Sequence, residues 1–258
     1  MKTADIQELS NFLLDYAVML MRSGANTERT VRNVIRISNS FGYDAAIAIF
    51  QRNITMTINN PNDSSKRRTS VKQQLPPHLS LSIVNDLSAL SWECFDTDLS
   101  LDEVKKKYNE IVSKAHSSSF VVLIFASFAI AAFCELFGGD YASMLIVFLS
   151  TLVAFSLRLL LINLKFDVRA MIIAVSFTAS FISFLIGTFL ISTNTLNVAV
   201  STSVLFLIPG VHIINSVTDI LDGHLMTGIA RAVSAMILVI CIAIGLYATL
   251  SITRWMFL

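Results

Sequence analysis

Charged residues are scarce in this sequence. Lys, Arg, Asp and Glu together make up 14% of the 258 residues and the mean hydropathy is +0.68, whereas globular domains are about one quarter charged. A chain with so few charges lacks the surface residues that a soluble protein of this length needs. Proline is also scarce, at four residues, while phenylalanine occurs eighteen times. This composition excludes intrinsic disorder.

Cysteine and motifs for cofactors are scarce too. The three cysteines, Cys94, Cys134 and Cys241, lie far apart, so the sequence predicts neither a disulfide framework nor a zinc site. It contains no glycine-rich phosphate loop and no Gly-x-Ser-x-Gly motif. The net charge of +1 lacks the basic surplus of a nucleic-acid-binding protein. We therefore expect no cofactor, no metal and no nucleic-acid partner.

The few charges that are present are unevenly distributed. Residues 1–116 hold fourteen of the nineteen Lys and Arg residues and thirteen of the eighteen Asp and Glu residues. Residues 117–258 hold five of each sign. The sequence thus predicts a soluble domain over 1–116 and a membrane domain over 117–258. The polar N-terminus has no apolar core of the kind found in a cleavable signal peptide.

The apolar part divides into five runs, each close to the roughly 20 residues needed to cross a bilayer. We expect five transmembrane helices, at residues 119–137, 141–162, 170–191, 196–214 and 225–252.

The links between these runs predict an orientation. Lys165 and Arg169 lie between the second and third runs, and Arg231 follows the fourth. Positive residues favour the cytoplasmic side, so we expect a cytoplasmic N-terminus and a C-terminus outside. Arg254 alone lies on the wrong side for this orientation.

The N-terminal part predicts a mixed α+β domain. Apolar residues recur every three to four positions from Ile6 to Leu20, which is typical of an amphipathic helix. Asn26 or Thr27 can cap a second helix that ends at Gly42. Residues 46–50 and 54–58 then indicate a hairpin, residues 61–65 a loop and residues 67–73 a third strand.

Two further helices are expected before the membrane domain. One lies around residues 81–93, and the other begins at a capping box formed by Ser100 and Glu103. The second helix carries the lysines 105–107 and is expected to lead past His116 into the first span. The lysine run could bind nucleic acid, but a basic segment that contacts anionic lipid headgroups is the plainer interpretation.

The most informative stretch is Leu207–His224. Pro209-Gly210 interrupts the fourth run, because proline removes a backbone donor and glycine tolerates the resulting geometry. A broken helix at membrane depth can line a binding cavity, as in many secondary transporters. A simple proline kink is the alternative.

Polar residues follow this break at helical spacing. His212, Asn215, Asp219 and Asp222 are three, four and three residues apart, so they project from one helical face if the segment is helical. They could line an inner vestibule or accept a proton. The alternative is that Asp219 and Asp222 lie in a solvated loop with no role in transport.

Three other ionisable residues are candidates for the pathway of substrate or protons. Glu135 lies near the outer end of the first run and could be a gate or an interfacial carboxylate that faces water. Arg158 and Arg231 lie near the expected inner face. Either could attract a carboxylate substrate or pair with an aspartate, and Arg158 could also simply reach the membrane surface.

The order of these features resembles the threonine/serine exporter family over nearly the full chain. The most specific segment runs from Pro209-Gly210 through Asn215, Asp219, Gly223 and Gly228 to Arg231. Weaker matches are Leu14–Gly24, Thr27–Arg29 and Phe137-Gly138-Gly139.

The resemblance implies a transporter and not an enzyme: a subunit of a secondary exporter of small hydrophilic metabolites, driven by the proton-motive force. It implies threonine or serine as substrate, with a succinate-like dicarboxylate as the alternative. It also implies a bacterial inner-membrane location. A second small membrane subunit or a homo-oligomer is expected, because five helices scarcely enclose a polar path.

The sequence is compatible with two other classes of function. The chain could be a membrane scaffold or sensor whose N-terminal domain binds a ligand. An intramembrane hydrolase is disfavoured because His212 has no recognisable serine partner.

Overall fold

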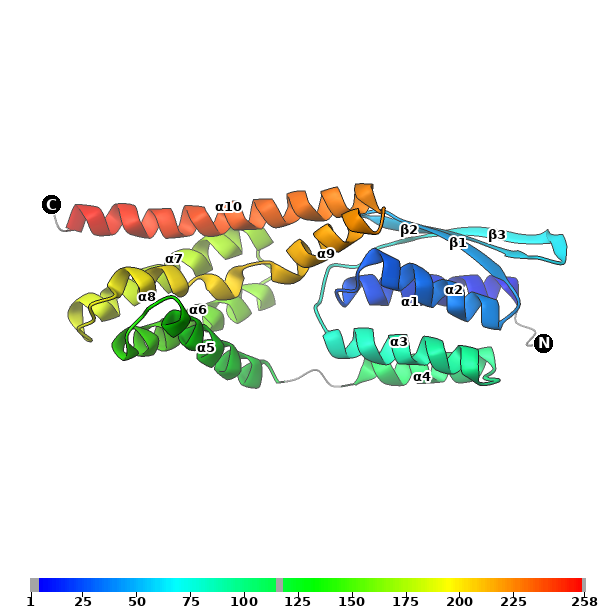
Figure 1. Ribbon diagram of the computed structural model, residues 1–258, viewed down its shortest axis with the longest axis horizontal. Helices are drawn as coiled ribbons and strands as arrows, with labels where there is room; N and C mark the ends of the chain where they lie inside the picture. The colour runs from blue at the N-terminus through cyan, green and yellow to red at the C-terminus, as the bar shows by residue number, and fades with distance from the viewer. Residues whose placement is uncertain (1–4, 115–117, 257–258) are drawn as a thin grey trace. The chain divides into compact units, whose positions relative to one another are not determined.

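The computed structural model describes residues 5–114 and 118–256. These residues form two compact units, and each unit is built from two separate segments of the sequence. The first unit takes in the described residues of Met1–Ala115 together with Gly210–Val233, and the second those of His116–Pro209 together with Ser234–Leu258. Figure 1 shows the order of the elements.

The first unit begins with two capped helices. The helix α1 spans Ile6–Arg22 and α2 spans Thr27–Ser40. The side chain of Asn26 accepts a hydrogen bond from the backbone N–H of Arg29 at 3.1 Å, which confirms the expected cap. Gly24 ends the first helix with φ = +98°, a conformation that favours glycine.

A three-stranded antiparallel sheet follows, in the order β1-β2-β3. The strands are β1 at Asp44–Ile49, β2 at Asn53–Asn60 and β3 at Asp63–Gln73. The predicted hairpin is confirmed, because Ile49 pairs with Ile54 across the short break. The third strand begins earlier than expected, so the loop predicted at residues 61–65 shrinks to a turn at residues 61–62.

Two more helices complete the N-terminal part. They are α3 at Leu81–Asp96 and α4 at Leu101–Ser113, and both halves of the predicted capping box at Ser100 and Glu103 are present. The helix α4 ends at Ser113 and does not continue into the first span as expected. His116 lies outside the described residues.

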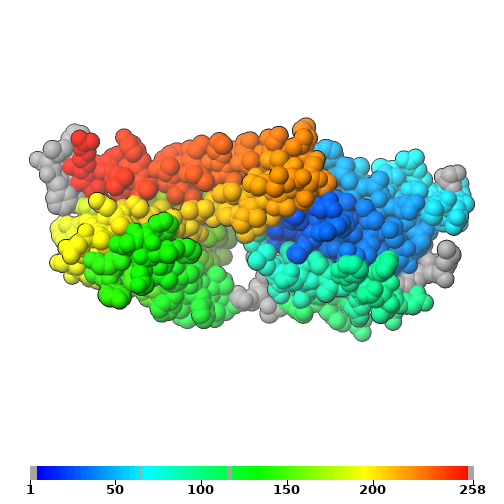
Figure 2. Space-filling view, viewed as in Figure 1, coloured from blue at the N-terminus to red at the C-terminus, as the bar shows by residue number. Residues whose placement is uncertain are grey.

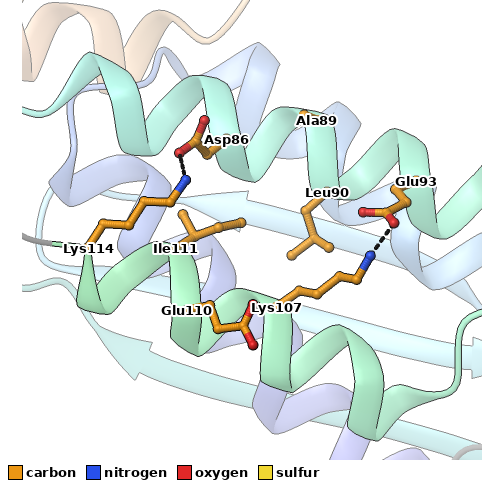
Figure 3. Close-up of a pocket in the computed structure, with 8 residues that line it drawn as sticks. All are labelled: Asp86, Ala89, Leu90, Glu93, Lys107, Glu110, Ile111 and Lys114. Atoms are coloured by element: carbon orange, nitrogen blue, oxygen red, sulfur yellow. Dashed lines mark hydrogen bonds and ion pairs between the residues drawn. The ribbon is translucent and has the colours of Figure 1, made fainter.

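Ion pairs join α3 to α4. Lys107 pairs with Glu93, and the Nζ atom of Lys114 lies 2.8 Å from a carboxylate oxygen of Asp86, on either side of Leu90 and Ile111 (Figure 3). Lys105 pairs with Glu8 of α1. Two lysines of the basic run thus contact carboxylates of their own unit. Contact of this run with lipid headgroups stays a prediction.

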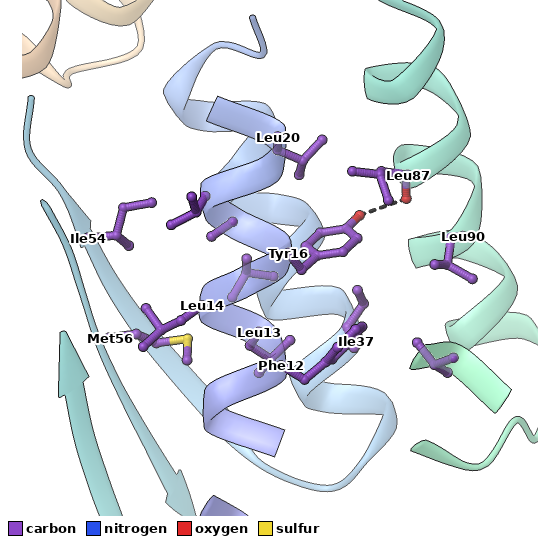
Figure 4. Close-up of a cluster of buried hydrophobic side chains, with 14 of the residues drawn as sticks. Phe12, Leu13, Leu14, Tyr16, Leu20, Ile37, Ile54, Met56, Leu87 and Leu90 are labelled. Carbon is purple, nitrogen blue, oxygen red and sulfur yellow. Dashed lines mark hydrogen bonds between the residues drawn. The ribbon is translucent and has the colours of Figure 1, made fainter. Parts of the chain in front are cut away.

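The hydrophobic core of this unit lies on both sides of α1. Ile54 and Met56 of β2 pack on one side and Leu87 and Leu90 of α3 lie on the other (Figure 4). The hydroxyl group of Tyr16 in α1 donates a hydrogen bond to the carbonyl oxygen of Leu87 at 2.7 Å, and burial raises the pKa of this hydroxyl. The unit is therefore layered, with α1 between the sheet and α3.

The second unit is helical and apolar. Its helices are α5 at Ser119–Leu136, α6 at Tyr141–Asn163, α7 at Val168–Phe189 and α8 at Leu196–Thr202, followed by a 3-10 turn, η1, at Leu205–Leu207. The helix α10, Leu225–Met256, contributes its residues from Ser234 onward. Among the described residues, four helices are long and apolar enough to cross a membrane, or five if the bent pair on either side of residues 208–209 counts as one span.

Buried hydroxyl groups join α7 to α10. Ser176 donates a hydrogen bond to the carbonyl oxygen of Ile242 at 2.8 Å, and the hydroxyls of Ser180 and Thr249 lie 2.7 Å apart. At Gly245, between these contacts, an added Cβ atom would lie 2.6 Å from the carbonyl oxygen of Ile173. Small residues here let the two backbones approach closely, as is common between membrane helices.

Asp140 joins two loops at one end of the second unit. It caps α6 by accepting a hydrogen bond from the backbone N–H of Ser143 at 2.7 Å. The same carboxylate accepts bonds from the hydroxyl of Thr193, at 2.8 and 2.9 Å, and from the backbone N–H of Asn194 at 3.1 Å. These donors hold the pKa of Asp140 well below its usual range, the N–H of Ser143 contributing most and the hydroxyl of Thr193 next.

We expect Asp140→Ala to lower the midpoint of thermal unfolding, Tm, by about 2 to 4 °C at pH 7, because both the cap and the link between the loops are lost. The pKa of Asp140 is depressed in the folded state, so its contribution is complete above the ordinary aspartate pKa. It is lost only as pH falls below about 4. The gap between wild type and variant should therefore be constant from pH 7 to pH 5 and shrink below pH 4.

Asp167→Ala is the matched control. Asp167 caps α7 through Arg169 and Ala170, and within the described part of the chain it accepts no bond from another loop. Its loss should lower Tm by less. Equal effects of the two substitutions would show that the bonds to Thr193 and Asn194 add no stability.

Candidate functional site

The fourth apolar segment is interrupted where the sequence predicts it. The helix α8 gives way to η1, residues 208–209 are not helical, and α9 begins at Gly210 and ends at Leu221. Pro209 cannot donate a backbone hydrogen bond and crowds the preceding turn. A Cβ atom added at Gly210 would meet nothing within 4 Å, so this glycine is not required by close packing.

Asp219 of α9 is completely buried, and both of its oxygens have partners. Its Oδ1 atom accepts a hydrogen bond from the backbone N–H of Thr27 at 2.8 Å, and its Oδ2 atom accepts one from the Thr27 hydroxyl at 3.0 Å. Thr27 is the first residue of α2, so this carboxylate lies at a helix N-terminus, where the helix dipole favours negative charge. The bonds join residues 192 positions apart.

Arg231 supplies the compensating charge. An Nη atom of Arg231 lies 3.1 Å from the Oδ2 atom of Asp219, and the exposed fraction of the arginine side chain is 15%. The other Nη atom donates to the carbonyl oxygen of Ala25 at 3.3 Å. The ion-paired Nη atom of Arg231 makes no hydrogen bond within the described residues, so Arg231 compensates the buried carboxylate by its charge, while Thr27 supplies the hydrogen bonds.

Asn215 extends the same contact by one helical turn. Its side-chain amide donates to the carbonyl oxygen of Gly24 at 2.8 Å. The loop favours glycine at Gly24 because of its φ angle of +98°. We call Asn215, Asp219 and Arg231 with residues 24–27 the Asp219 cluster. In Figure 2 the orange segment that carries α9 lies against the blue segments of the same unit.

A second set of contacts lies just beyond α9. His224 Nε2 lies 3.3 Å from a carboxylate oxygen of Glu28 in α2, and the hydroxyl of Thr227 donates to the carbonyl oxygen of Ile49 at 2.7 Å. A cavity of about 310 Å³ opens beside them, lined by residues of α2, the end of β1 and Gly223–Thr227. It is lined mainly by apolar side chains, and His224 is the titratable group in its wall.

The Asp219 cluster is suited to holding α9 and the start of α10 against the loop between α1 and α2. Each oxygen of the carboxylate accepts a hydrogen bond from Thr27 and the carboxylate is completely buried, so a ligand has no access to it in this arrangement. Within the part of the chain that the structure describes, no group of three or more His, Cys, Asp and Glu residues could hold a metal ion.

The other predicted residues are placed differently. Asp222 follows the end of α9 and is exposed, and His212 is half-buried. Glu135 is exposed near the end of α5. Arg158 lies in α6 of the second unit, where its Nε atom is buried without a hydrogen-bond partner among the described residues. The structure thus brings together Asn215, Asp219 and Arg231 of the predicted set, and their role in a substrate or proton pathway stays a prediction.

Sequence reasoning named Arg231 as a possible partner of an aspartate but missed Thr27 as the hydrogen-bond donor to Asp219. Thr27 was expected only as a helix cap, and Glu28 and Thr227 were not singled out. Thr27-Glu28 does lie within a stretch that resembles the exporter family. No periodicity or spacing could have indicated that this stretch contacts a segment almost two hundred residues later.

Comparisons with known proteins match nearly the whole chain. The family model described as "Putative threonine/serine exporter" (ThrE) matches residues 11–253. A Klebsiella aerogenes protein named "Probable succinate transporter subunit YjjP" is 24% identical over 248 residues, covering 96% of this chain and 94% of the relative. The Escherichia coli protein of the same name is 24% identical over 254 residues, covering 98% and 97%. No solved structure matches this chain.

Proposed function

Because the chain belongs to the threonine/serine exporter family, we propose that it is one subunit of a secondary exporter of small hydrophilic metabolites, driven by the proton-motive force, with threonine and serine as its first substrates. The expected family is confirmed, and with it a multi-pass membrane protein that functions in transport and export. The family is one of transporters and not of enzymes.

The observation that carries this proposal is the interruption of an apolar segment at residues 208–209. Backbone groups at such a break lose their helical partners, which is costly in lipid unless they line a cavity or are covered by protein. Secondary transporters bind small polar substrates at breaks of this kind.

Succinate is the second candidate substrate. The two relatives that match this chain over nearly their full lengths are named succinate transporter subunits. Succinate, threonine and serine share a carboxylate group, so one site for a small carboxylic acid would accommodate either class.

We propose a second subunit and a defined orientation as well. The relatives are named as subunits. Many secondary transporters consist of two halves of inverted topology, and five spans would form one such half, so another chain would supply the second half. Lys165, between α6 and α7, and Arg169, in the first turn of α7, favour the cytoplasmic side. This orientation gives a cytoplasmic N-terminal domain and an outer C-terminus. The membership of the exporter family supports a bacterial inner-membrane location.

Transport by reconstituted protein tests the proposal. The full chain is purified in mild detergent with any membrane partner it retains, and proteoliposomes are loaded with labelled threonine, serine or succinate. We expect release of at least one substrate to accelerate several-fold under an imposed pH gradient. A protonophore should abolish that acceleration.

The exporter proposal would be overturned if all three substrates left the proteoliposomes no faster than they leave protein-free liposomes. A scaffold or sensor function would then be indicated by tight binding of one of these ligands without flux. The need for a second subunit is tested with vesicles that contain the chain alone. If the exporter depends on a partner, these vesicles show no flux.

A further inference from the structure

An arginine near one end of an apolar helix of the second unit has neither a hydrogen bond nor an ion pair within the described residues. Arg158 lies in α6, five residues before its end at Asn163. Its Nε atom is buried, and the side chain makes neither a hydrogen bond nor an ion pair with any residue in the ranges 5–114 and 118–256. The arginine as a whole is partly buried, and a guanidinium nitrogen that is removed from water without an acceptor is costly. Some acceptor is expected to occupy this position when the protein functions.

The direction of this side chain argues against a simple contact with the membrane surface. The guanidinium carbon lies 5.6 Å from the centre of the Phe155 ring, one turn earlier in α6. An arginine that reached for the interface would extend past the nearer end of the helix, toward Asn163. Arg158 instead points back along α6 into the apolar span, as helical side chains generally do.

The arginine also lies close to the interruption in the fourth segment. The ring of Phe155 contacts that of Phe206, with centroids 5.8 Å apart. Phe206 belongs to η1, the turn that directly precedes residues 208–209. Arg158 therefore belongs to a cluster that ends at the broken backbone, and all of these residues are in the second unit.

A second group without a partner lies on the same face of α6. Thr151 is fully buried, and its hydroxyl has no hydrogen-bond partner among the residues described. Seven residues separate it from Arg158, close to two helical turns, so the two side chains share one face. The guanidinium of Arg158 and the hydroxyl of Thr151 thus lie on either side of Phe155 in the helix, and neither has a hydrogen-bond acceptor or donor among the described residues.

We propose that Arg158 binds the carboxylate group of the transported metabolite, with Thr151 as a second hydrogen-bonding group deeper in the span. This inference rests on the exporter function proposed above and names its specificity-determining residue. The planar guanidinium can donate two parallel hydrogen bonds to one carboxylate. The aromatic rings of Phe155 and Phe206 exclude water around that contact and so strengthen it.

The test compares arginine variants in the full chain with its copurified partner. Arg158→Gln should raise the KM for succinate and threonine by about tenfold to a hundredfold, the cost of losing one charged hydrogen-bonding pair. Arg158→Lys should raise it less, since a charge remains without the bidentate geometry. Arg254→Gln, which changes an exposed arginine of α10 in the same unit, should leave KM unchanged.

The second measurement is ligand-induced stabilisation in detergent, which requires no flux. Succinate or threonine should raise the Tm of wild type and of Arg254→Gln but not of Arg158→Gln. Threoninol, which replaces the carboxylate by an alcohol, should raise none of them. Unchanged KM, or unchanged ligand-induced stabilisation, in Arg158→Gln would overturn the assignment.

Failure of the assignment and failure of the exporter function are distinguishable. If the wild-type protein transports and Arg158→Gln transports with the same KM, only the role of Arg158 is overturned. Absence of wild-type flux overturns the exporter proposal, and the Tm measurement then decides the binding role. Vesicles with and without anionic lipid test for a lipid headgroup as the acceptor: an effect of Arg158→Gln confined to vesicles with anionic lipid would contradict carboxylate binding.

Discussion

Asp219→Ala should lower the free energy of unfolding of the full chain by about 3 to 5 kcal/mol, the cost of breaking a buried ion pair by removing one partner. The substitution leaves Arg231, whose side chain is 15% exposed, without its counter-charge, and it leaves the N–H and hydroxyl of Thr27 without an acceptor. Denaturant unfolding in mixed micelles measures the loss. Trp92 in α3 provides a fluorescent probe in the same unit.

Asp222→Ala is the matched control for this prediction. Asp222 lies three residues later and is exposed, so its removal should change the free energy of unfolding by less than about 0.5 kcal/mol. In a double-mutant cycle, Arg231→Ala should cost much less when Asp219 is already alanine. Equal effects of the two aspartate substitutions, or additive effects in the cycle, would mean that the ion pair does not stabilise the unit.

Gly245→Leu should have the second largest effect, a loss of about 3 kcal/mol or more, because overpacking at a backbone contact cannot be relieved by rotating a side chain. The nearest atoms to an added Cβ include the carbonyl oxygen of Ile173 at 2.6 Å and the backbone nitrogen of Phe177 at 2.8 Å. Separation of α7 from α10 would also break the bond from Ser176 to Ile242. The yield of monodisperse protein and its Tm measure the effect.

Ala243→Leu introduces the same isobutyl side chain two residues away. Ala243 is exposed on α10, so a larger apolar side chain there should leave Tm within about 1 °C of the wild-type value. If both variants unfold at the same temperature, the close approach of α7 and α10 at Gly245 is not what holds these helices together.

Local features of the fold could be predicted because their causes are local. The cap at Asn26, the capping box at Ser100 and the hairpin between Ile49 and Ile54 each depend on neighbouring residues. The interruption at Pro209 belongs to the same class, since proline acts on its own helix. The start of β3 and the end of α4 were less well predicted, because charged and polar sequences continue a strand or end a helix without a strong local signal.

The candidate site could be predicted only in part. The spacing of Asn215 and Asp219 correctly placed both side chains on one face of a helix, and Arg231 was named as a possible partner of Asp219. What that face contacts could not be read from spacing, because Thr27 lies 192 residues away in the sequence. The direction of Arg158 also depends on tertiary packing, through Phe155 and Phe206.

The return of α9 to the N-terminal unit has a consequence for biosynthesis. The amino end of α2 leaves the ribosome early, but its carboxylate partner, Asp219, follows only after α5, α6, α7 and α8 have been made. Until then the N–H of Thr27 and the carbonyl oxygens of Gly24 and Ala25 lack the partners that they have in the finished protein. The N-terminal unit is therefore completed only after these four helices. Its final contacts can form only when the apolar segments before residue 210 have been synthesised.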